Sequence, residues 1–366
     1  MKKILFLSSD ISSGGGTERI AIGLANALSD LKSARSYEVH IYSLYGSNKP
    51  FFELNANINV STLLKSYPPL PLVLPYVVAK FRAYLRKHDI DLVIGIGTML
   101  SLVALPACVG LKPKHFAWEH FNFSLALGSR KERFARAVAA RFAAAIIVLT
   151  ETDRKQFAAH MKCQAELLVI ANFLTFKVTG RADVSSKRAL AVGRLTRQKG
   201  FDTLLEIWKV VAPQCPEWHL DIVGSGEDLE MLDQQISDYN LEHSVNIIPA
   251  TSGIAAYYQR SSVFLLSSRW EGLPMVMIEA QSFGLPMVSF DCLTGPRDVI
   301  THERNGMLVN DQDEAAFADA LKLLMTNPAL LASMSAAALA DSERFSAPVI
   351  LEKWHALLDK HLTESC

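Results

Sequence analysis

Two cations near the middle of the chain have the types and spacing of a phosphate-binding pair. Arg194 and Lys199 lie in GRLTRQKGFD (193–202), directly after the apolar run 189–192. A guanidinium offers a planar fork of donors and an ammonium a compact charge, so together they suit a pyrophosphate. If the apolar run is a buried strand, both cations lie at its carboxyl end, where parallel sheets bind ligands. The alternative is a solvated surface loop.

Two carboxylates follow at a spacing that suits recognition of a sugar. Glu271 and Glu279 frame the sequence EGLPMVMIE, in which Pro274 favours the first turn of a helix. Glu279 then lies among apolar neighbours about one and a half turns into the helix, where an unpartnered carboxylate is costly to bury. Two sugar hydroxyls would satisfy it, and the helix start beside Leu273 could receive a phosphate. The alternative is a capping glutamate followed by a glutamate on a helix face.

A glycine run near the amino terminus could bring backbone N–H groups to an anion. Gly14, Gly15 and Gly16 follow the apolar run 4–9 and open a helix-like segment. Their spacing matches neither GxGxxG nor GxxxxGK[ST], so it predicts no dinucleotide or P-loop fingerprint, and a flexible turn is the alternative. An Asp-x-Asp sequence at 89–91 precedes a strand-like run instead of following one. We interpret it as the start of a strand and not as a metal site.

Short apolar runs alternate with amphipathic segments along the chain, which predicts parallel sheets covered by helices on both faces. In the first half the predicted strands are 4–9, 39–44, 92–96, 115–119 and 145–149, with helices at 18–29, 72–88 and 131–143. In the second half the predicted strands are 189–192, 219–223, 245–248, 263–266, 287–290 and 307–309, with helices at 201–211, 229–239, 253–260, 274–283 and 314–326. We therefore expect an α/β protein with two Rossmann-like, doubly wound domains.

A polar stretch at 175–187 separates the two halves, and 366 residues are enough for two domains. We expect an amino-terminal domain at 1–171, a carboxyl-terminal domain at 172–345, and a final helix within 346–366 that returns to the first domain. The stretch 92–111 carries no charge over 20 residues, the length of a membrane span. Its glycines and proline favour a buried strand followed by a buried helix instead.

Composition excludes several classes of protein. Half of the residues are hydrophobic and 20% are charged, which excludes a disordered chain. The 37 basic and 37 acidic residues balance, which argues against a protein that grips nucleic acid along its whole length. Five scattered cysteines without a CxxC pair predict neither a zinc ribbon nor a disulfide framework, and they fit a reducing, cytoplasmic compartment. The apolar run at 4–7 is too short for a secretory signal, which needs about 7–15 residues.

Five motifs in a fixed order resemble the retaining glycosyltransferases of family 4, which have the GT-B fold. They are GGTER at 15–19, VGRLTRQKGFD at 192–202, SSRWEGLPMVMIEAQSFGLPMVS at 267–289, GPRD at 295–298 and NGMLV at 305–309. The resemblance spans nearly the whole chain. It implies two Rossmann-like domains facing a central cleft, the first binding the acceptor and the second binding a nucleotide sugar.

The resemblance implies a role for each of the residues singled out above. Arg194 and Lys199 would hold the donor diphosphate, Glu271 would bind hydroxyls of the donor sugar, and Glu279 would bind those of ribose. His120, which follows a first-domain strand, would lie near the transferred sugar, although a lone histidine in such a place is more often structural. The other donor-binding residues would be Gly15, Gly16, Gly193, Gly272, Leu273, Pro274 and Met275.

The resemblance also implies the reaction. A hexose or an N-acetylhexosamine would pass from a UDP-linked sugar to a lipid-linked or lipopolysaccharide glycan, as in the assembly of bacterial surface polysaccharide. The leaving diphosphate would assist attack on the same face, and Arg194 and Lys199 would stabilise its charge in place of a metal. We therefore expect neither a metal nor a cofactor. The alternatives are a nucleotide-sugar epimerase of the same build and an inactive nucleotide-sugar-binding subunit. A dehydrogenase lacks support, because Gly224 and Gly226 are not followed by the third glycine of a dinucleotide-binding motif.

The balanced net charge conceals an asymmetry between the two halves. Residues 1–171 contain 21 Lys and Arg against 12 Asp and Glu, a net charge of +9, whereas residues 172–366 contain 16 against 25, a net charge of −9. In the first half the basic residues cluster at 80–87 and 130–141, interleaved with aromatic residues. Such helices can lie on an anionic membrane, which predicts a peripheral protein on the inner face of the bacterial cytoplasmic membrane. The alternative is an ordinary helix with a solvated basic face.

Overall fold

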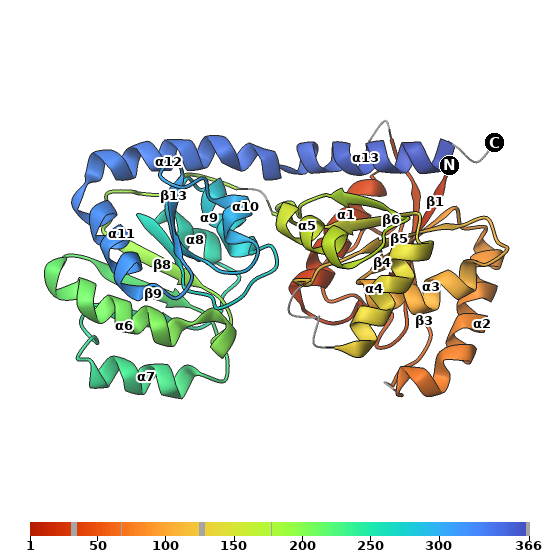
Figure 1. Ribbon diagram of the computed structural model, residues 1–366, viewed down its shortest axis with the longest axis horizontal. Coiled ribbons are helices and arrows are strands. Elements are labelled where there is room, and N and C mark those ends of the chain that lie inside the picture. The colour runs from red at the N-terminus through yellow and green to blue at the C-terminus, as the bar shows by residue number, and fades with distance from the viewer. Residues whose placement is uncertain (31–34, 67, 124–128, 177, 364–366) are drawn as a thin grey trace. The chain divides into compact units, whose positions relative to one another are not determined.

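The chain folds into two compact units, each built around its own sheet. The computed structural model describes residues 1–30, 35–66, 68–123, 129–176 and 178–363. Unit 1 comprises Met1–Thr175 together with Ala347–Cys366, and unit 2 comprises Phe176–Ser346 (Figure 1). Each unit is described by itself below.

The described residues of unit 1 form a seven-stranded parallel sheet with the order β3-β2-β1-β4-β5-β6-β7. Its strands are β1 Lys3–Ser8, β2 Glu38–Ser43, β3 Asn59–Thr62, β4 Leu92–Ile96, β5 Lys114–Trp118, β6 Ala145–Val148 and β7 Glu166–Val169. The helices that flank it are α1 Gly16–Leu28, α2 Leu70–His88, α3 Ser101–Cys108, α4 Arg130–Phe142, α5 Glu151–His160 and α13 Ala347–Thr363. The central strands are buried because helices cover both faces, and they are correspondingly apolar.

Unit 2 repeats this plan with a six-stranded parallel sheet, again within the described residues, in the order β10-β9-β8-β11-β12-β13. Its strands are β8 Arg188–Val192, β9 His219–Val223, β10 Val245–Ile248, β11 Val263–Leu266, β12 Met287–Asp291 and β13 Gly306–Asn310. Its helices are α6 Phe201–Val211, α7 Leu229–Asp238, α8 Ile254–Gln259, α9 Met275–Ser282, α10 Pro296–Val299, α11 Glu314–Thr326 and α12 Pro328–Ser342. The expectation of two Rossmann-like, doubly wound domains is confirmed.

Each sheet contains one switch point, where successive connections turn in opposite directions. In unit 1 it lies between β1 and β4, and in unit 2 between β8 and β11. Since all strands of a sheet run parallel, their carboxyl ends share one edge, and in folds of this kind ligands bind at that edge beside the switch point. The loops after these four strands therefore carry the best-placed side chains of each unit.

The carboxyl-terminal helix α13 belongs to unit 1, although it follows unit 2 in the sequence. Trp354 on this helix is almost fully buried, and its ring lies 5.0 Å from that of Trp118 at the end of β5. Further along the helix, Lys360 pairs with Glu166 at 2.8 Å, and the backbone carbonyl of His361 accepts a hydrogen bond from the amino group of Lys114. α13 thus contributes both core and ion pairs to unit 1.

Several elements differ from the sequence-based predictions. The sequence-based predictions do not include the helices α5, α10 and α12, nor β3 and β7 at the edges of the unit 1 sheet. β3 is exposed or half-buried and lacks a continuous apolar run, whereas β7 is half-buried although three of its four residues are apolar. The uncharged stretch 92–111 divides into β4 and α3, as expected. In the part of the chain that the structure describes, no single helix is long and apolar enough to cross a membrane; the helices of 314–326 and 328–363, bent by 100°, reach that length and composition only together.

Candidate functional site

The switch point of unit 2 joins a cation to a carboxylate. Lys199 follows β8 and Glu271 follows β11, and the Nζ atom of Lys199 lies 2.6 Å from Oε1 of Glu271. Their side chains are only 14% and 7% exposed. In such surroundings an ion pair is screened weakly by solvent, so each group fixes the other in place. The structure therefore brings together two of the residues that the sequence singled out 72 positions apart.

The other predicted residues of this loop lie beside the pair. Arg194 is exposed, and within the described ranges no carboxylate pairs with it. Gly193 packs beneath the stem of Lys199, so that a Cβ atom added there would lie 3.1 Å from the lysine side chain. Gly224, after β9, approaches the carbonyl of Gly193 so closely that a Cβ atom would lie 1.9 Å from its oxygen. Glycines here let two loops pack at the switch point, and the guanidinium of Arg194 is left at the surface.

The loop from Glu271 to Met275 is held from behind by the segment after β12. Thr294 donates a hydrogen bond from its hydroxyl to the backbone carbonyl of Glu271. Gly295 has a φ of +96°, and a Cβ atom there would lie 2.1 Å from the carbonyl oxygen of Gly272. This close contact explains why glycine stands at position 295.

The helix after this loop begins one residue later than the proline pattern predicts. Pro274 precedes α9 as its N-cap, with extended backbone, and Met275 is the first helical residue. Leu273 and Pro274 are buried, whereas Gly272 and Met275 are partly exposed. Backbone N–H groups of a first helical turn have no partner within the helix, so this end can receive an anion.

Glu279 is buried, as the sequence suggested, and a tyrosine hydroxyl is one of its partners. The carboxylate, on the fifth residue of α9, accepts a hydrogen bond of 2.8 Å from the hydroxyl of Tyr258 on α8. Glu279 is 5% exposed and Tyr258 is fully buried. The sequence analysis missed Tyr258, because it stands in a short helix outside the recognised motifs. The hydrogen bond from Tyr258 therefore orients the carboxylate of Glu279, one of the candidate donor-binding residues.

In unit 1 the glycine run caps the first helix. Gly15 is the N-cap of α1 and Gly16 is its first residue. The carboxylate of Glu18 folds back over Gly15, so that a Cβ atom there would lie 2.4 Å from Oε2. Burial, together with the nearby charge of Asp10, raises the pKa of Glu18 above its ordinary value. A carboxyl group of this chain thus lies at the helix start where the sequence suggested that an anion binds.

His120 follows β5 at the carboxyl edge of the unit 1 sheet. Its ring packs 4.4 Å from that of Trp118, and its Nε2 atom is shielded from solvent with no hydrogen-bond partner among the described residues. Burial lowers the pKa of His120 to about 3. The imidazole is therefore neutral near pH 7, and it can act there as a hydrogen-bonding group but not as a cation.

A buried ion pair supports the loop that carries His120. Glu119 accepts hydrogen bonds from Arg136 at 2.9 Å and from the hydroxyl of Thr98 at 2.6 Å. Arg136 in turn donates to the backbone carbonyl of Phe123 at 2.7 Å. The interpretation of Arg136 as part of a basic surface is wrong: it is 1% exposed, because it lies on the inner face of α4. Because Arg136 binds Glu119 and the carbonyl of Phe123, it holds both ends of the segment 119–123 in place.

The described residues thus contain two separate groups of candidates. Unit 2 gathers Gly193, Arg194, Lys199, Glu271, Gly272, Leu273, Pro274, Met275 and Glu279 around its switch point. Unit 1 carries Gly15, Gly16 and His120 on its own carboxyl edge. Two further polar atoms at these edges, Oγ of Ser268 and Oδ1 of Asn172, are buried without a partner in the described part of the chain. Ser268 lies in the motif at 267–289 but was not singled out there, and Asn172 lies in no motif.

Comparison with known proteins gives consistent matches over both units. Residues 14–175 match the family described as Glycosyltransferase Family 4, and residues 175–341 match Glycosyl transferases group 1. A glycosyltransferase of Haemophilus influenzae is 36% identical over 98% of this chain and 100% of its own length. The amylovoran biosynthesis glycosyltransferase AmsD of Erwinia amylovora is 31% identical, with 98% and 100% covered. The crystal structure of Anabaena HepE in complex with UDP has a TM-score of 0.81 at 22% identity, over 98% and 100% of the two chains.

Proposed function

The chain belongs to the family-4 glycosyltransferases of the GT-B type, and on that premise we propose that it transfers a hexose or an N-acetylhexosamine from a UDP-linked sugar to a lipid-linked or lipopolysaccharide glycan. Transfer retains the anomeric configuration. The Erwinia relative acts in amylovoran biosynthesis, and the Anabaena neighbour binds UDP. The first supports a role in polysaccharide assembly, and the second supports a UDP-linked donor.

One observation carries the donor assignment: the Lys199–Glu271 pair at the switch point of unit 2, beside the exposed Arg194. The ammonium and the guanidinium bind the two phosphates of the donor, and the start of α9 adds backbone N–H groups. Glu271 accepts hydrogen bonds from hydroxyls of the sugar while it holds Lys199 in place. Glu279, oriented by Tyr258, binds the ribose hydroxyls.

These residues also suit a retaining reaction. As the bond to the sugar breaks, negative charge accumulates on the departing diphosphate, and Arg194 and Lys199 stabilise it. The same diphosphate accepts the proton of the acceptor hydroxyl, which attacks on the face that the leaving group vacates. We assign to His120 a neutral imidazole near the sugar, and to Gly15 and Gly16 the lining of the phosphate and acceptor side. The proposed reaction uses no metal ion.

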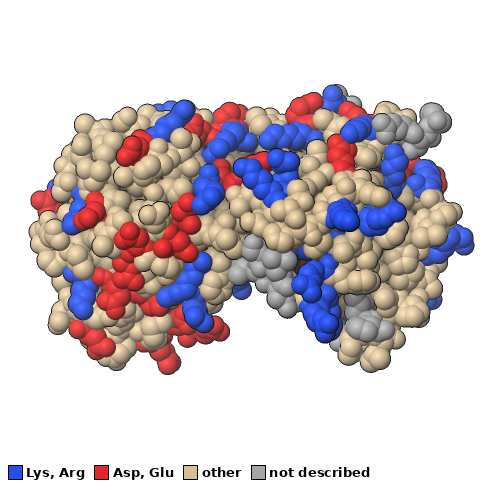
Figure 2. Space-filling model, viewed as in Figure 1, with Lys and Arg blue, Asp and Glu red and all other residues tan. Residues whose placement is uncertain are grey.

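The acceptor side of the proposal rests on the charge of unit 1. On the face that Figure 2 shows, acidic side chains gather over unit 2, whereas basic ones are the more frequent over unit 1. A basic surface suits an anionic membrane and a lipid-linked acceptor embedded in it. We therefore assign acceptor binding and peripheral membrane contact to unit 1.

A screen for nucleotide release tests this function. The purified protein is incubated with a panel of UDP-linked and other nucleotide sugars, with lipid-linked glycans added or omitted, in chelator and in Mg²⁺. We expect UDP release that depends on the acceptor, with a product of retained configuration. Conversion of a UDP sugar without any acceptor would identify an epimerase, and no turnover with any donor would favour an inactive subunit. Activity lost in chelator and restored by Mg²⁺ would contradict the metal-free mechanism.

A further inference from the structure

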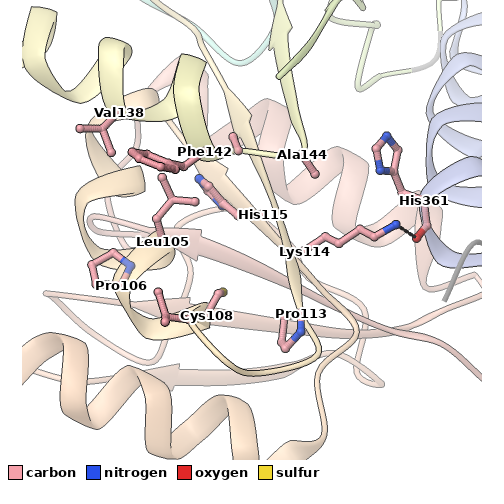
Figure 3. Close-up of a pocket in the computed structure, with 12 residues that line it drawn as sticks. Leu105, Pro106, Cys108, Pro113, Lys114, His115, Val138, Phe142, Ala144 and His361 are labelled. Carbon is pink, nitrogen blue, oxygen red and sulfur yellow. Dashed lines mark hydrogen bonds between the residues drawn. The ribbon is translucent and has the colours of Figure 1, made fainter. Parts of the chain in front are cut away.

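Unit 1 contains an apolar pocket that the transfer reaction does not use. It has a volume of about 740 Å³ and opens between α3, α4 and the start of β5 (Figure 3). Ligand pockets of proteins range from about 300 to 1,000 Å³, so the size suits a small molecule or a chain. Its apolar wall is formed by Leu105, Pro106, Val109, Pro113, Val138 and Phe142.

The pocket lies at the edge of the sheet away from the reaction. Lys114 and His115, which begin β5, line it, whereas His120 follows the far end of the same strand. α4 runs between the two edges: it starts at Arg130, after the loop that carries His120, and ends at Phe142 on the pocket rim. A helix of 13 residues is about 20 Å long. The pocket is therefore too far from His120 to hold the reacting sugar.

Two titratable groups that line the pocket, His115 and Cys108, are uncharged at neutral pH, and the charged amino group of Lys114, which also lines it, donates a hydrogen bond to the backbone carbonyl of His361. Burial lowers the pKa of His115 to about 4 and raises the pKa of the Cys108 thiol to about 12. His115 binds the hydroxyl of Ser101 through Nε2 at 2.9 Å. The walls therefore favour an apolar occupant over a charged metabolite or a second diphosphate.

Apolar residues at the mouth of the pocket are exposed to solvent. Val109 is 70% exposed and Phe142 is 64% exposed, and Phe134, two turns before Phe142 on α4, is 62% exposed. Apolar surface at the rim of a concave apolar site is typical of a contact surface.

The exposed face of α4, which ends at this mouth, is positively charged along its length. It carries Arg130, Lys131, Arg133 and Arg141, and none of the four pairs with a carboxylate within the described residues. The guanidinium of Arg141 lies over the ring of Phe142, 5.3 Å from its centroid. Glu132 is the single acidic residue of the helix, and it is half-buried. An occupant with an apolar chain and an anionic head complements both features.

We propose that this pocket takes an acyl chain of an anionic phospholipid, with the headgroup held by Arg141 at the mouth, while the other cations of α4 attract the anionic surface. The inference deepens the proposed membrane contact of unit 1 and rests on it, but not on the identity of the sugar. The Phe142 end of α4 lies against the bilayer and anchors the enzyme. Its Arg130 end lies toward the carboxyl edge, where a lipid-linked acceptor would reach His120.

Vesicle flotation tests the proposal with the full-length protein and vesicles of phosphatidylglycerol and phosphatidylcholine. We expect binding to mixed vesicles and at least tenfold weaker binding to vesicles of phosphatidylcholine alone. Ala144→Leu narrows the pocket without changing a charge and should weaken binding about tenfold. The matched control is Ala137→Leu, which adds the same side chain to the exposed face of α4 outside the pocket and should leave binding unchanged or stronger. Equal vesicle binding by the two variants would overturn the assignment of this pocket as the site of the acyl chain.

Tryptophan fluorescence provides a second test, which needs no substitution that narrows the pocket. Phe142→Trp and Phe134→Trp place reporters at two exposed positions of α4, one on the rim and one away from it. With brominated acyl chains, the added tryptophan should be quenched at least twofold more at 142 than at 134. Equal quenching, or no binding to any vesicle, would overturn the proposal. Transfer to a water-soluble acceptor is measured in parallel, because its failure would contradict the proposed function and not the pocket.

Discussion

The amino group of Lys199 lies 2.6 Å from the carboxylate of Glu271, across the switch point of the unit 2 sheet. The two residues stand on the loops after β8 and β11, the neighbouring strands between which the connections change direction. The carboxylate fixes the ammonium where a diphosphate would meet it. Preorganised charge of this kind stabilises a developing anion without reorganisation at the moment of reaction.

Replacing the cations should slow transfer. A hydrogen bond to a charged group contributes about 1.5–3 kcal/mol. Lys199→Ala and Arg194→Ala should therefore lower kcat/KM for the donor by about tenfold to more than a hundredfold each, measured by UDP release. Arg197→Ala is the matched control, since Arg197 is an exposed cation of the same loop, and its kcat/KM should change less than threefold. Unchanged turnover in both test variants would remove the diphosphate assignment.

The hydrogen bond between Tyr258 and Glu279 predicts an effect on donor binding. If Glu279 holds the ribose in ground state and transition state alike, Glu279→Gln raises KM about tenfold or more with little change in kcat. Tyr258→Phe removes only the bond that orients the carboxylate, so KM should rise less, about twofold to fivefold. Inhibition of transfer by free UDP provides a second measure of the affinity for the donor nucleotide. A fall in kcat at constant KM would place Glu279 in the chemical step instead.

Much of the fold could be predicted from the sequence because the buried strands carry their own signal. Leu92–Ile96 is buried at every position, and its composition is correspondingly apolar. Asn59–Thr62 is exposed or half-buried at every position and carries one apolar residue, Val60, so it gives no apolar run of its own. Fully buried strands are thus visible in one sequence, whereas a polar edge strand such as Asn59–Thr62 becomes visible only through its pairing with β2.

The same distinction applies to the candidate site. Lys199, Glu271 and Glu279 could be singled out because each stands in a local motif beside a strand. Tyr258 and Arg136 could not, because their importance comes from a partner 21 or 17 residues away that only the fold brings near. An arginine on a helix otherwise rich in basic residues looks like surface until the fold shows which face is buried.

Breaking the Glu119–Arg136 pair should destabilise the protein. Removal of one member of a buried pair costs about 3–5 kcal/mol, because the other charge is left uncompensated. Arg136→Met should lower the free energy of unfolding by that amount in urea titration, and adding Glu119→Gln should restore part of it. Arg133→Met, on the exposed face of the same helix, is the control and should change stability by less than about 0.5 kcal/mol. Equal effects of the two single variants would contradict the buried pair.

Two histidines with lowered pKa values should make the protein less stable at mildly acidic pH. Burial lowers the pKa of His115 to about 4 and that of His120 to about 3, whereas an unfolded histidine titrates near 6.5. Below pH 6.5 the unfolded chain binds protons that the folded chain does not, so stability falls as the pH falls toward those values. Each histidine contributes a slope of at most about 1.4 kcal/mol per pH unit.

Urea titrations from pH 7 to pH 5 measure this slope. The double variant His115→Gln with His120→Gln should show a shallower dependence than the parent protein, whatever its stability at pH 7. Part of the slope will remain, because burial also lowers the pKa of His88 and of His355. His243→Gln, at an exposed position, should leave the slope unchanged. Parallel curves for the double variant and the parent would refute the assignment.

The contact between Trp354 and Trp118 links the carboxyl-terminal helix to the strand that precedes His120. Trp354 is 1% exposed and packs against Trp118, which in turn packs against the ring of His120. Truncation of a buried aromatic side chain costs about 3–5 kcal/mol, so Trp354→Ala should lower the free energy of unfolding by that amount. Ending the chain after Ser346 removes all of α13 and should destabilise unit 1 further.

Limited proteolysis followed by mass spectrometry shows which unit has lost stability. We expect cleavage within residues 1–175 to become faster in Trp354→Ala and in the truncated chain, while cleavage within 176–346 is unchanged. Lys353→Ala, at the exposed position before Trp354, is the control and should behave like the parent protein. Since Trp118 packs against His120, transfer activity should fall together with the stability of unit 1. A truncated chain with unchanged proteolysis of residues 1–175 would show that α13 does not stabilise unit 1.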